Sequence, residues 1–401
     1  MRLTARPMAA ALCTVCTLAH APRAVAQTKP SVDARTWRPS TDAEANLVLE
    51  PVVTPGPWRW NAGAWLAYAR DPVSWNGAPA QSWTPVRDAL STDLVAALGL
   101  GERASIGLDV PLLLWQDGAS SLPGAVVAGG SVPGASIGDV VVTGKAAVVS
   151  NDRQGMRGGF GVALLASVSV PTGDRRSFFG DGALTSSLAL LGEYALGVVA
   201  VRASAGYLLR TGARRWPGDP LWGVPFGDAL PWALGIALRP EILAAWLDSG
   251  DRQTWEVAAH GALPAGPIAP FGLGDPGATL VSPALLSVDD RVAVGHGREV
   301  SVVVGCDIGL DTAVGVPPIR GVVSVAWAPR THDKDMDGVP DDIDECPDLA
   351  EDADGIQDGD GCPEDDADAD GILDTSDACP LAPGVPSPDP KKNGCPAPGA
   401  P

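Results

Sequence analysis

The feature that most constrains this chain is a two-residue alternation of apolar with small or polar side chains, repeated in stretches of about ten residues. Between residues 103 and 114 one face carries Ala104, Ile106, Leu108, Val110, Leu112 and Leu114, and the other carries Arg103, Ser105, Gly107, Asp109 and Pro111. Residues 138–149 and 198–210 repeat the pattern. A period of two predicts β-strands with one apolar and one polar side.

The alternation predicts twelve strands, with boundaries good to a few residues. They lie at 58–70, 87–99, 102–115, 137–150, 157–171, 183–195, 198–210, 227–239, 241–249, 253–263, 299–309 and 319–328. Residues 264–298 are too long for a tight turn, and another hairpin there would give fourteen strands.

Two folds compete for this body, a lipid-embedded barrel and a soluble β-sandwich. No stretch of 18 apolar residues follows the N-terminal region, which excludes a transmembrane helix. Strand length near ten, long connections alternating with short ones, and tryptophans at strand ends favour the barrel (Trp58, Trp60, Trp115, Trp232, Trp255 and Trp327). We therefore predict an all-β fold, an antiparallel transmembrane β-barrel of about 12 strands with 14 possible.

A barrel of this kind has a polar interior. The alternation places Arg103, Asp109, Asp139, Lys145, Arg202 and Arg210 on the polar side, so these residues are the lumen candidates. An even strand count puts both termini of the barrel on the periplasmic side.

Residues 1–26 have the pattern of a secretory signal. Arg2 and Arg6 precede a short apolar stretch, and Ala24-Val25-Ala26 is a small-x-small cleavage site. We predict a signal peptide at 1–26, an N-terminal segment at 27–56 and the barrel at 57–330. Export implies an oxidising compartment for the mature chain.

The last sixth of the chain differs from the rest in its charge. Residues 332–395 carry 21 acidic residues and three lysines, which accounts for most of the net charge of −20. An acidic chain has no basic face for a phosphate backbone, so nucleic-acid binding is excluded as a function class.

Aspartates in this tail recur with a fixed spacing. Residues 333–346 and 366–379 both fit D-x-D-x-D-G-x-x-D-x-x-D-x-C. Residues 351–362 are a partial copy, which lacks the first Asp because Ala350 stands at that position. Carboxylates at positions 1, 3, 5, 9 and 12, with a backbone carbonyl at 7, give a shell of hard oxygens that selects Ca²⁺. The alternative, a disordered acidic linker, is the common meaning of an acidic run but does not explain the repeated spacing.

The spacing therefore predicts calcium ligands in each copy. They are Asp333, Asp335, Asp337, Asp341 and Asp344 with the carbonyl of Val339, then Asp352, Asp354, Asp358 and Asp360, and finally Asp366, Asp368, Asp370, Asp374 and Asp377 with the carbonyl of Ile372.

Four cysteines accompany these copies, at 346, 362, 379 and 395. Three pairings are possible, and we favour Cys346–Cys362 with Cys379–Cys395 because neighbours close first. Cys306 is left unpaired.

These Asp-rich, Cys-terminated units resemble thrombospondin type 3 repeats. The resemblance implies repeats over about 331–396, followed by a short C-terminal tail at 397–401. The combination with VVSVAWAPR (322–330) and PTGDRRSFFGDG (171–182) is similar to outer-membrane barrel proteins of myxobacteria. The segment SPDPKKNGCP (387–396) resembles the lead-in to an OmpA-like peptidoglycan-binding domain, and we expect the protein to lack that domain.

These observations predict an outer-membrane barrel, structural or a small pore, with a periplasmic calcium-binding spacer. Its predicted partners are lipid and calcium, with peptidoglycan or an envelope protein as further candidates. The alternative is a secreted calcium-dependent adhesion protein with a sandwich body. We predict no enzyme, because the nucleophile-elbow match at 134–138 lacks the helix that this motif requires.

Overall fold

The computed structural model describes most of the body and part of the tail. It covers residues 33–329 except 77–81, 119–133, 150–158, 175–176, 212–213, 216–224, 241–252, 267–281 and 296–298, together with 346, 349–350, 362–363, 371–372 and 376–396. The predicted signal peptide lies outside these residues. Among the described residues, no helix is long and apolar enough to cross a bilayer.

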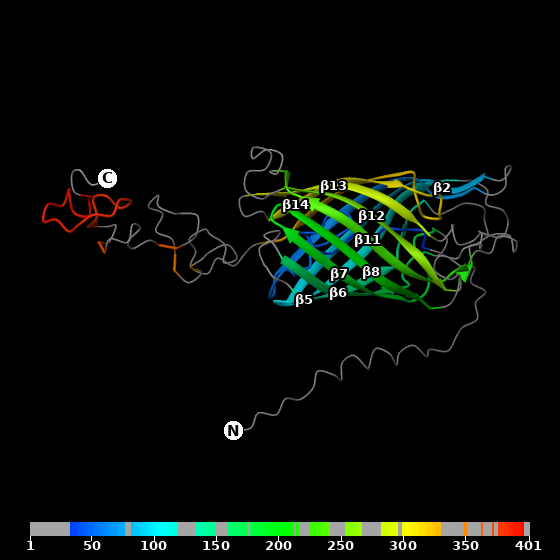
Figure 1. Cartoon of the computed structure of the whole chain (residues 1–401). Coiled ribbons are helices and arrows are strands. Elements are labelled where there is room, and N and C mark those ends of the chain that lie inside the picture. The colour runs from blue at the N-terminus through cyan, green and yellow to red at the C-terminus, as the bar shows by residue number, and fades with distance from the viewer. Residues whose placement is uncertain are drawn as a thin grey trace, which may run out of the picture.

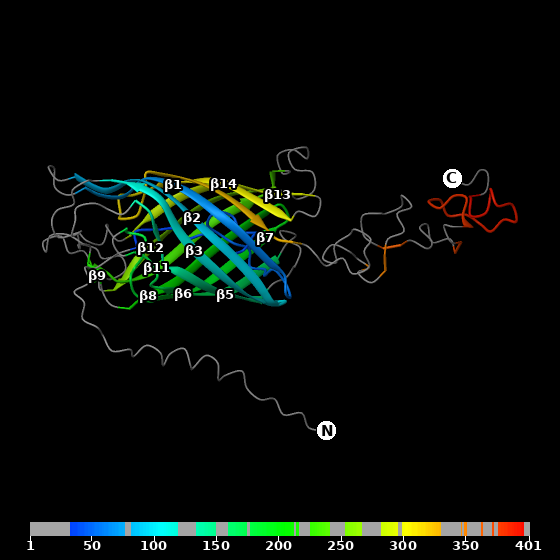
Figure 2. The same cartoon turned by 180° about the vertical axis from the view of Figure 1, so that it is seen from behind.

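The body is a closed antiparallel barrel of twelve long strands (Figures 1 and 2). These are β1 (Trp60–Asn76), β2 (Ser82–Gly101), β3 (Ala104–Asp117), β5 (Val140–Val149), β6 (Gly159–Val170), β7 (Thr185–Leu196), β8 (Val199–Arg210), β11 (Asp228–Leu238), β12 (Gln253–Gly266), β13 (Ala284–Val294), β14 (Val300–Gly309) and β15 (Ile319–Trp327). Short strands β4 (Ser136–Ile137), β9 (Arg214–Arg215) and β10 (Pro225–Phe226) lie in the connections. The first strand closes the barrel on the last, from Ala62 opposite Trp327 to Arg70 opposite Ile319.

Closure decides between the two predicted folds. A sandwich has two sheets with free edges, whereas here every long strand has a neighbour on both sides. The barrel prediction is confirmed, and the sandwich alternative is wrong.

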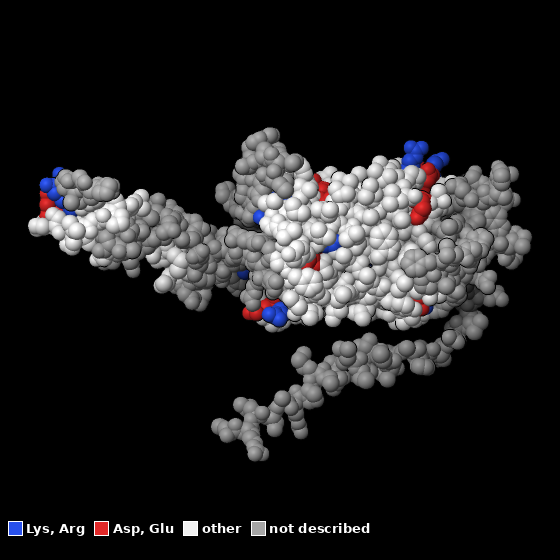
Figure 3. Space-filling model, in the orientation of Figure 1, with Lys and Arg blue, Asp and Glu red and all other residues white. Residues whose placement is uncertain are grey.

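The two-residue alternation sorts the side chains between the outside and the lumen. Along β15, outward side chains are exposed and inward ones are buried in strict alternation. Large apolar side chains are exposed on the outward face, among them Leu188, Leu234, Val304 and Val325. Figure 3 shows one side of the barrel as a broad uncharged surface, with charged atoms mainly toward its two ends. Such a surface suits the hydrocarbon region of a membrane.

The two ends of the barrel differ. At the turn end, β2 and β3 are joined by residues 102–103, β7 and β8 by 197–198, and β13 and β14 by 295–299. At the loop end, connections such as 171–184 and 211–227 are longer. Exposed tryptophans lie at both ends, with Trp115 at the loop end and Trp58, Trp60 and Trp327 at the turn end, where the rings of Trp60 and Trp327 lie 5.3 Å apart.

Two strand predictions need correction, although the count of twelve is right. The predicted strand 241–249 lies outside the described residues, and β11 pairs directly with β12, so no strand stands between them in the sheet. The region 264–298 contains one barrel strand, β13, rather than a loop or a hairpin.

The lumen is occupied by the chain itself. Residues 33–56, which we call the lumen segment, run inside the barrel without regular secondary structure before β1 begins (dark blue in Figures 1 and 2). Leu47 and Leu49 are each 1% exposed, and Val52 is 2% exposed. Because side chains buried to this degree form a core, the interior of the barrel is packed rather than empty.

Candidate functional site

The lumen segment enters at the loop end of the barrel. The backbone N–H of Asp33 donates to Asp181 Oδ1 at 3.2 Å, and that of Ala34 to the carbonyl of Phe178 at 3.1 Å. The Thr36 hydroxyl donates to the carbonyl of Gly315 at 2.8 Å. All three acceptors lie in loop-end connections.

The segment leaves at the turn end. The Thr54 hydroxyl donates to the carbonyl of Glu102 at 3.1 Å, in the connection between β2 and β3. The N–H of Trp58 donates to the carbonyl of Gly99 at 3.0 Å. The segment therefore passes from one end of the barrel to the other.

Buried ion pairs bind the segment to the wall. Lys145 Nζ, on β5, lies 2.9 Å from Asp42 Oδ2 and 3.6 Å from Glu50 Oε2. Arg35 Nη1 donates to Asp93 Oδ1 on β2 at 3.2 Å. Each charge is removed from water and has a partner of opposite sign, which is the condition for burying it.

On the opposite side of the lumen, wall carboxylates accept hydrogen bonds from the segment. Asp289 on β13 accepts from Asn46 Nδ2 at 2.8 Å and from the N–H of Leu47 at 3.3 Å. Glu256 on β12 accepts from the N–H of Leu49 at 3.3 Å. Arg202 Nη1 on β8 donates to Asn46 Oδ1 at 3.3 Å. The bonds from Leu47 and Leu49 supply partners for backbone N–H groups that have no strand neighbour.

Apolar contacts fill the space between the polar ones. Leu49 packs on Ala233 and Ala258, and Val52 packs on Ala163 and Leu191. Burying a leucine or valine contributes about 1.5–3 kcal/mol relative to leaving it exposed. Small wall residues leave the room that these larger side chains of the segment occupy.

Three glycines of the wall leave room for the segment, because a side chain at these positions would collide with it. A Cβ at Gly107 would lie 2.1 Å from the Thr41 hydroxyl, and one at Gly161 would lie 3.2 Å from Val52 Cβ. At Gly235 an added Cβ would come within 2.9 Å of a methyl of Leu49. By contrast, Gly144 faces outward with open space.

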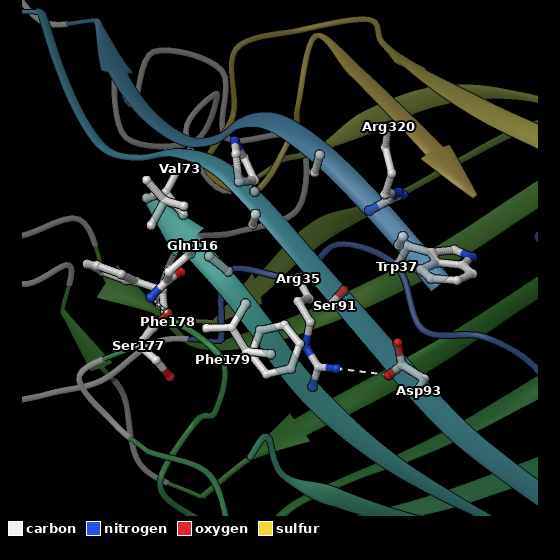
Figure 4. Close-up of a pocket in the computed structure, with 18 residues that line it drawn as sticks. Arg35, Trp37, Val73, Ser91, Asp93, Gln116, Ser177, Phe178, Phe179 and Arg320 are labelled. Atoms are coloured by element: carbon white, nitrogen blue, oxygen red, sulfur yellow. Dashed lines mark hydrogen bonds and ion pairs between the residues drawn. The ribbon is translucent and has the colours of Figure 1, made fainter. Parts of the chain in front are cut away.

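A cavity of about 60 Å³ remains at the loop end, between the segment and strands β1 to β3 (Figure 4). Arg35, Trp37, Asp93 and Phe179 are among the residues that line it. Arg35 and Asp93 form an ion pair at the edge of the lining, and the Arg35 guanidinium lies 4.1 Å from the centre of the Phe179 ring. The charged groups are thus already matched by groups of the protein.

The loop-end connections are tied to the wall by Asp139, which precedes β5. Its carboxylate accepts from the N–H of Gly173 at 2.8 Å and from the N–H of Asp181 at 2.6 Å. Burial raises the pKa of the Asp139 carboxyl, and the two N–H groups act in the opposite direction.

The predicted lumen residues fall mostly where the alternation placed them. Asp109, Asp139, Lys145 and Arg202 are buried inside the barrel, and Arg210 pairs with Asp181 at 3.5 Å. Arg103 is exposed at the turn between β2 and β3, so that prediction is wrong. Its position next to a tight turn takes it out of the alternation.

Several inward residues were missed by sequence reasoning. They include Asp93, Glu256, Asp289, Asp307 and Arg320. Arg320 Nε donates to Asp307 Oδ2 at 2.6 Å, and its guanidinium lies 5.1 Å from the ring centre of Trp37 in the segment. The available signal was a charged residue at a position that alternates with outward apolar residues, as Glu256 does beside Val257 and Asp307 beside Ile308.

The buried pairs give a stability prediction. Lys145→Met is expected to lower the free energy of unfolding by about 3–5 kcal/mol, because Asp42 and Glu50 would remain buried without a cation. Arg87→Met is the control, because Arg87 pairs with Asp117 on the exposed surface and such pairs contribute about 0–1 kcal/mol. Denaturant unfolding in lipid vesicles measures both, and equal losses would contradict the buried role of Lys145.

In the tail, the structure supports the predicted disulfides. Cys346 is bonded to Cys362 and Cys379 to Cys395, and Cys306 is a free cysteine. Most of the predicted calcium ligands lie outside the described residues, and Ile372 and Asp377 are the two that lie within them. Within the described part of the chain, no group of three or more His, Cys, Asp or Glu is arranged to hold a metal.

The described part of the last copy fits a calcium loop. Gly371, at position 6, has a φ of +88°, which permits the sharp turn that this position needs. Asp377, at position 12, accepts the N–H of Cys379 through Oδ1 at 2.6 Å, while its Oδ2 is buried and has no hydrogen-bond partner among the described residues. A buried carboxylate oxygen in that condition is suited to a cation.

Comparison with known families identifies the tail. Residues 331–351 and 351–386 match the thrombospondin type 3 repeat. Repeats of this family bind calcium. The match covers the tail and not the barrel, and no curated protein matches the chain.

Solved structures resemble the barrel. The COG4313 outer membrane channel from Pseudomonas putida F1 is 11% identical, with 70% of this chain and 99% of that chain covered and a TM-score of 0.46. The NanC porin is 8% identical, with 67% and 98% covered and a TM-score of 0.37. The translocator domain of the autotransporter NalP from Neisseria meningitidis is 12% identical, with 68% and 88% covered and a TM-score of 0.35. Likeness at this level concerns the fold alone.

Proposed function

We propose that this chain is a non-conducting outer-membrane anchor, closed by its own N-terminal segment, that holds a calcium-stabilised repeat tail in the periplasm. Of the two roles predicted from the sequence, structural or small-pore, the packing of the lumen favours the structural one. The observation that carries the proposal is the burial of Leu47, Leu49 and Val52 inside the barrel.

The strand geometry supports the placement of the tail. β15 ends at Trp327 at the turn end, and short turns face the periplasm in bacterial outer-membrane barrels. The tail would then act as a spacer, with its length maintained by calcium and by disulfides that an oxidising compartment permits.

Other parts of the sequence-based assignment stay predictions. They are the peptidoglycan or envelope-protein partner, the likeness to myxobacterial and OmpA-like proteins, and the absence of enzymatic activity. The domain limits 1–26, 27–56, 57–330 and 331–396 also stay predictions.

Recording in a planar bilayer tests the proposal. The intact protein is expected to insert without resolved single-channel steps, because the lumen segment occupies the pathway. Insertion is verified by protease protection of the barrel in vesicles prepared from the same sample. Regular steps of one size from inserted, intact protein would show that the barrel is a pore instead.

A further inference from the structure

The route of the lumen segment has a consequence for the two ends of the chain. The strands alone would leave the chain before β1 and the chain after β15 on the same side of the membrane, since β1 begins and β15 ends at the turn end. This was the expectation from an even strand count. The lumen segment changes it, because Asp33 lies at the loop end, bonded to Asp181.

We infer that residues 33–56 cross the membrane inside the barrel, so that the chain before Asp33 and the chain after β15 are presented on opposite faces. The segment adds a thirteenth crossing to the twelve strands, made by chain without regular secondary structure. Irregular backbone is tolerated at membrane depth where it is enclosed by protein, as it is here.

The direction is fixed by the contacts of the first and last parts of the segment, whereas its middle part stays near one depth, since Asp42 and Glu50 both pair with Lys145. Thr36 contacts Gly315 in a loop-end connection, and Thr41 lies against Gly107, close to the turn-end start of β3. Val52 then lies against Gly161, at the turn-end start of β6, and Thr54 reaches Glu102 in a tight turn. A segment that entered and returned on the same side could not make contacts at both ends.

The crossing is also held firmly. Side-chain or backbone groups of the segment bond to Asp93, Lys145, Arg202, Glu256 and Asp289, on five different strands. Because these strands are distributed around the barrel, the segment cannot leave the lumen without breaking buried polar contacts on several sides. The protein thereby joins the two faces of the membrane by one continuous, anchored polypeptide.

Epitope accessibility in whole cells tests the inference. Three versions of the full chain carry one epitope each, between Ser31 and Val32, within the 119–133 connection at the loop end, or after Pro401. The expected result is that the first two epitopes share the same accessibility and the third has the opposite one. If the Ser31 epitope instead behaves like the one after Pro401 in folded protein, the inference is wrong.

The same experiment separates this inference from the proposed function. The first two epitopes could need permeabilised cells while the third does not. The two termini would then lie on opposite faces of the membrane, with the repeat tail outside the cell. In that case the further inference holds and only the proposed orientation of the barrel fails. Folding is checked by the mobility shift of unheated barrels in gels. If the Ser31 epitope prevents folding, Ser31→Cys in a Cys306→Ser background, labelled with a membrane-impermeant maleimide, gives the same decision.

Discussion

Deletion of residues 33–56 is expected to convert a closed barrel into one that conducts ions. The deletion leaves a wall with polar inward side chains, and water would fill the space that Leu47, Leu49 and Val52 now occupy. Planar-bilayer recording is expected to change from no resolved steps to regular single-channel steps.

The ion preference of the emptied barrel is also predictable. Among the described residues, inward acidic side chains outnumber basic ones, with Asp93, Asp109, Asp139, Glu193, Glu256, Asp289 and Asp307 against Lys145, Arg202, Arg210, Arg291 and Arg320. A lumen lined with excess negative charge favours cations. Reversal potentials in a salt gradient measure this, and a preference for anions would contradict the assignment of these residues to the wall.

Because the deleted protein could fail to fold, a point variant provides an independent test. Gly107→Val places methyl groups where Thr41 now lies and should loosen the segment, producing intermittent conductance and a lower unfolding midpoint. Gly144→Val is the matched control, since Gly144 is also a strand glycine but faces open space outside the barrel. Equal behaviour of the two variants would show that Thr41 does not pack against the wall.

Removal of calcium is expected to expand the tail. Without the cation, the closely spaced carboxylates repel each other, and the repeats lose the centre around which their loops fold. Adding EDTA to the full chain in detergent should increase its hydrodynamic radius, measured by light scattering, and excess calcium should reverse the change. A radius that does not respond to EDTA would contradict calcium-dependent folding of the repeats.

Single substitutions test whether Asp377 is a calcium ligand. Asp377→Ala should weaken calcium binding by about tenfold or more, because it removes a charged ligand from position 12 of the last full repeat. Asp389→Ala is closely matched, since Asp389 likewise accepts the N–H two residues ahead but lies outside the repeated spacing. Calcium titration by calorimetry compares them, and equal losses would mean that Asp377 acts through its backbone hydrogen bond only.

The sequence predicted the outer surface of this molecule better than its interior. Lipid imposes the same demand on every strand, so the outward side chains alternate regularly, as along β15. The inward side chains instead match the lumen segment locally. Asp289 makes β13 resemble a loop in the sequence, yet in the structure it accepts two hydrogen bonds from the segment.

The lumen segment itself could not be recognised from its pattern. Residues 33–56 alternate neither at two nor at 3.6 residues, because their partners lie on several sides of the barrel. The inward glycines at 107, 161 and 235 were visible, but a sequence does not show that another part of the chain fills the space beside them. The calcium ligands of the tail, by contrast, could be predicted from the sequence, because their spacing is set within one short stretch of chain.

Cross-linking tests the closed lumen most directly. A Cβ at Gly161 would lie 3.2 Å from Val52 Cβ, close to the separation of about 3.5–4.5 Å found in disulfides. In a Cys306→Ser background, Val52→Cys with Gly161→Cys should therefore form a bond in native membranes, detected as a linked peptide by mass spectrometry. Val52→Cys with Gly144→Cys, on the outer face, should not. Absence of the Val52–Gly161 link in correctly folded barrels would show that the segment does not occupy the lumen.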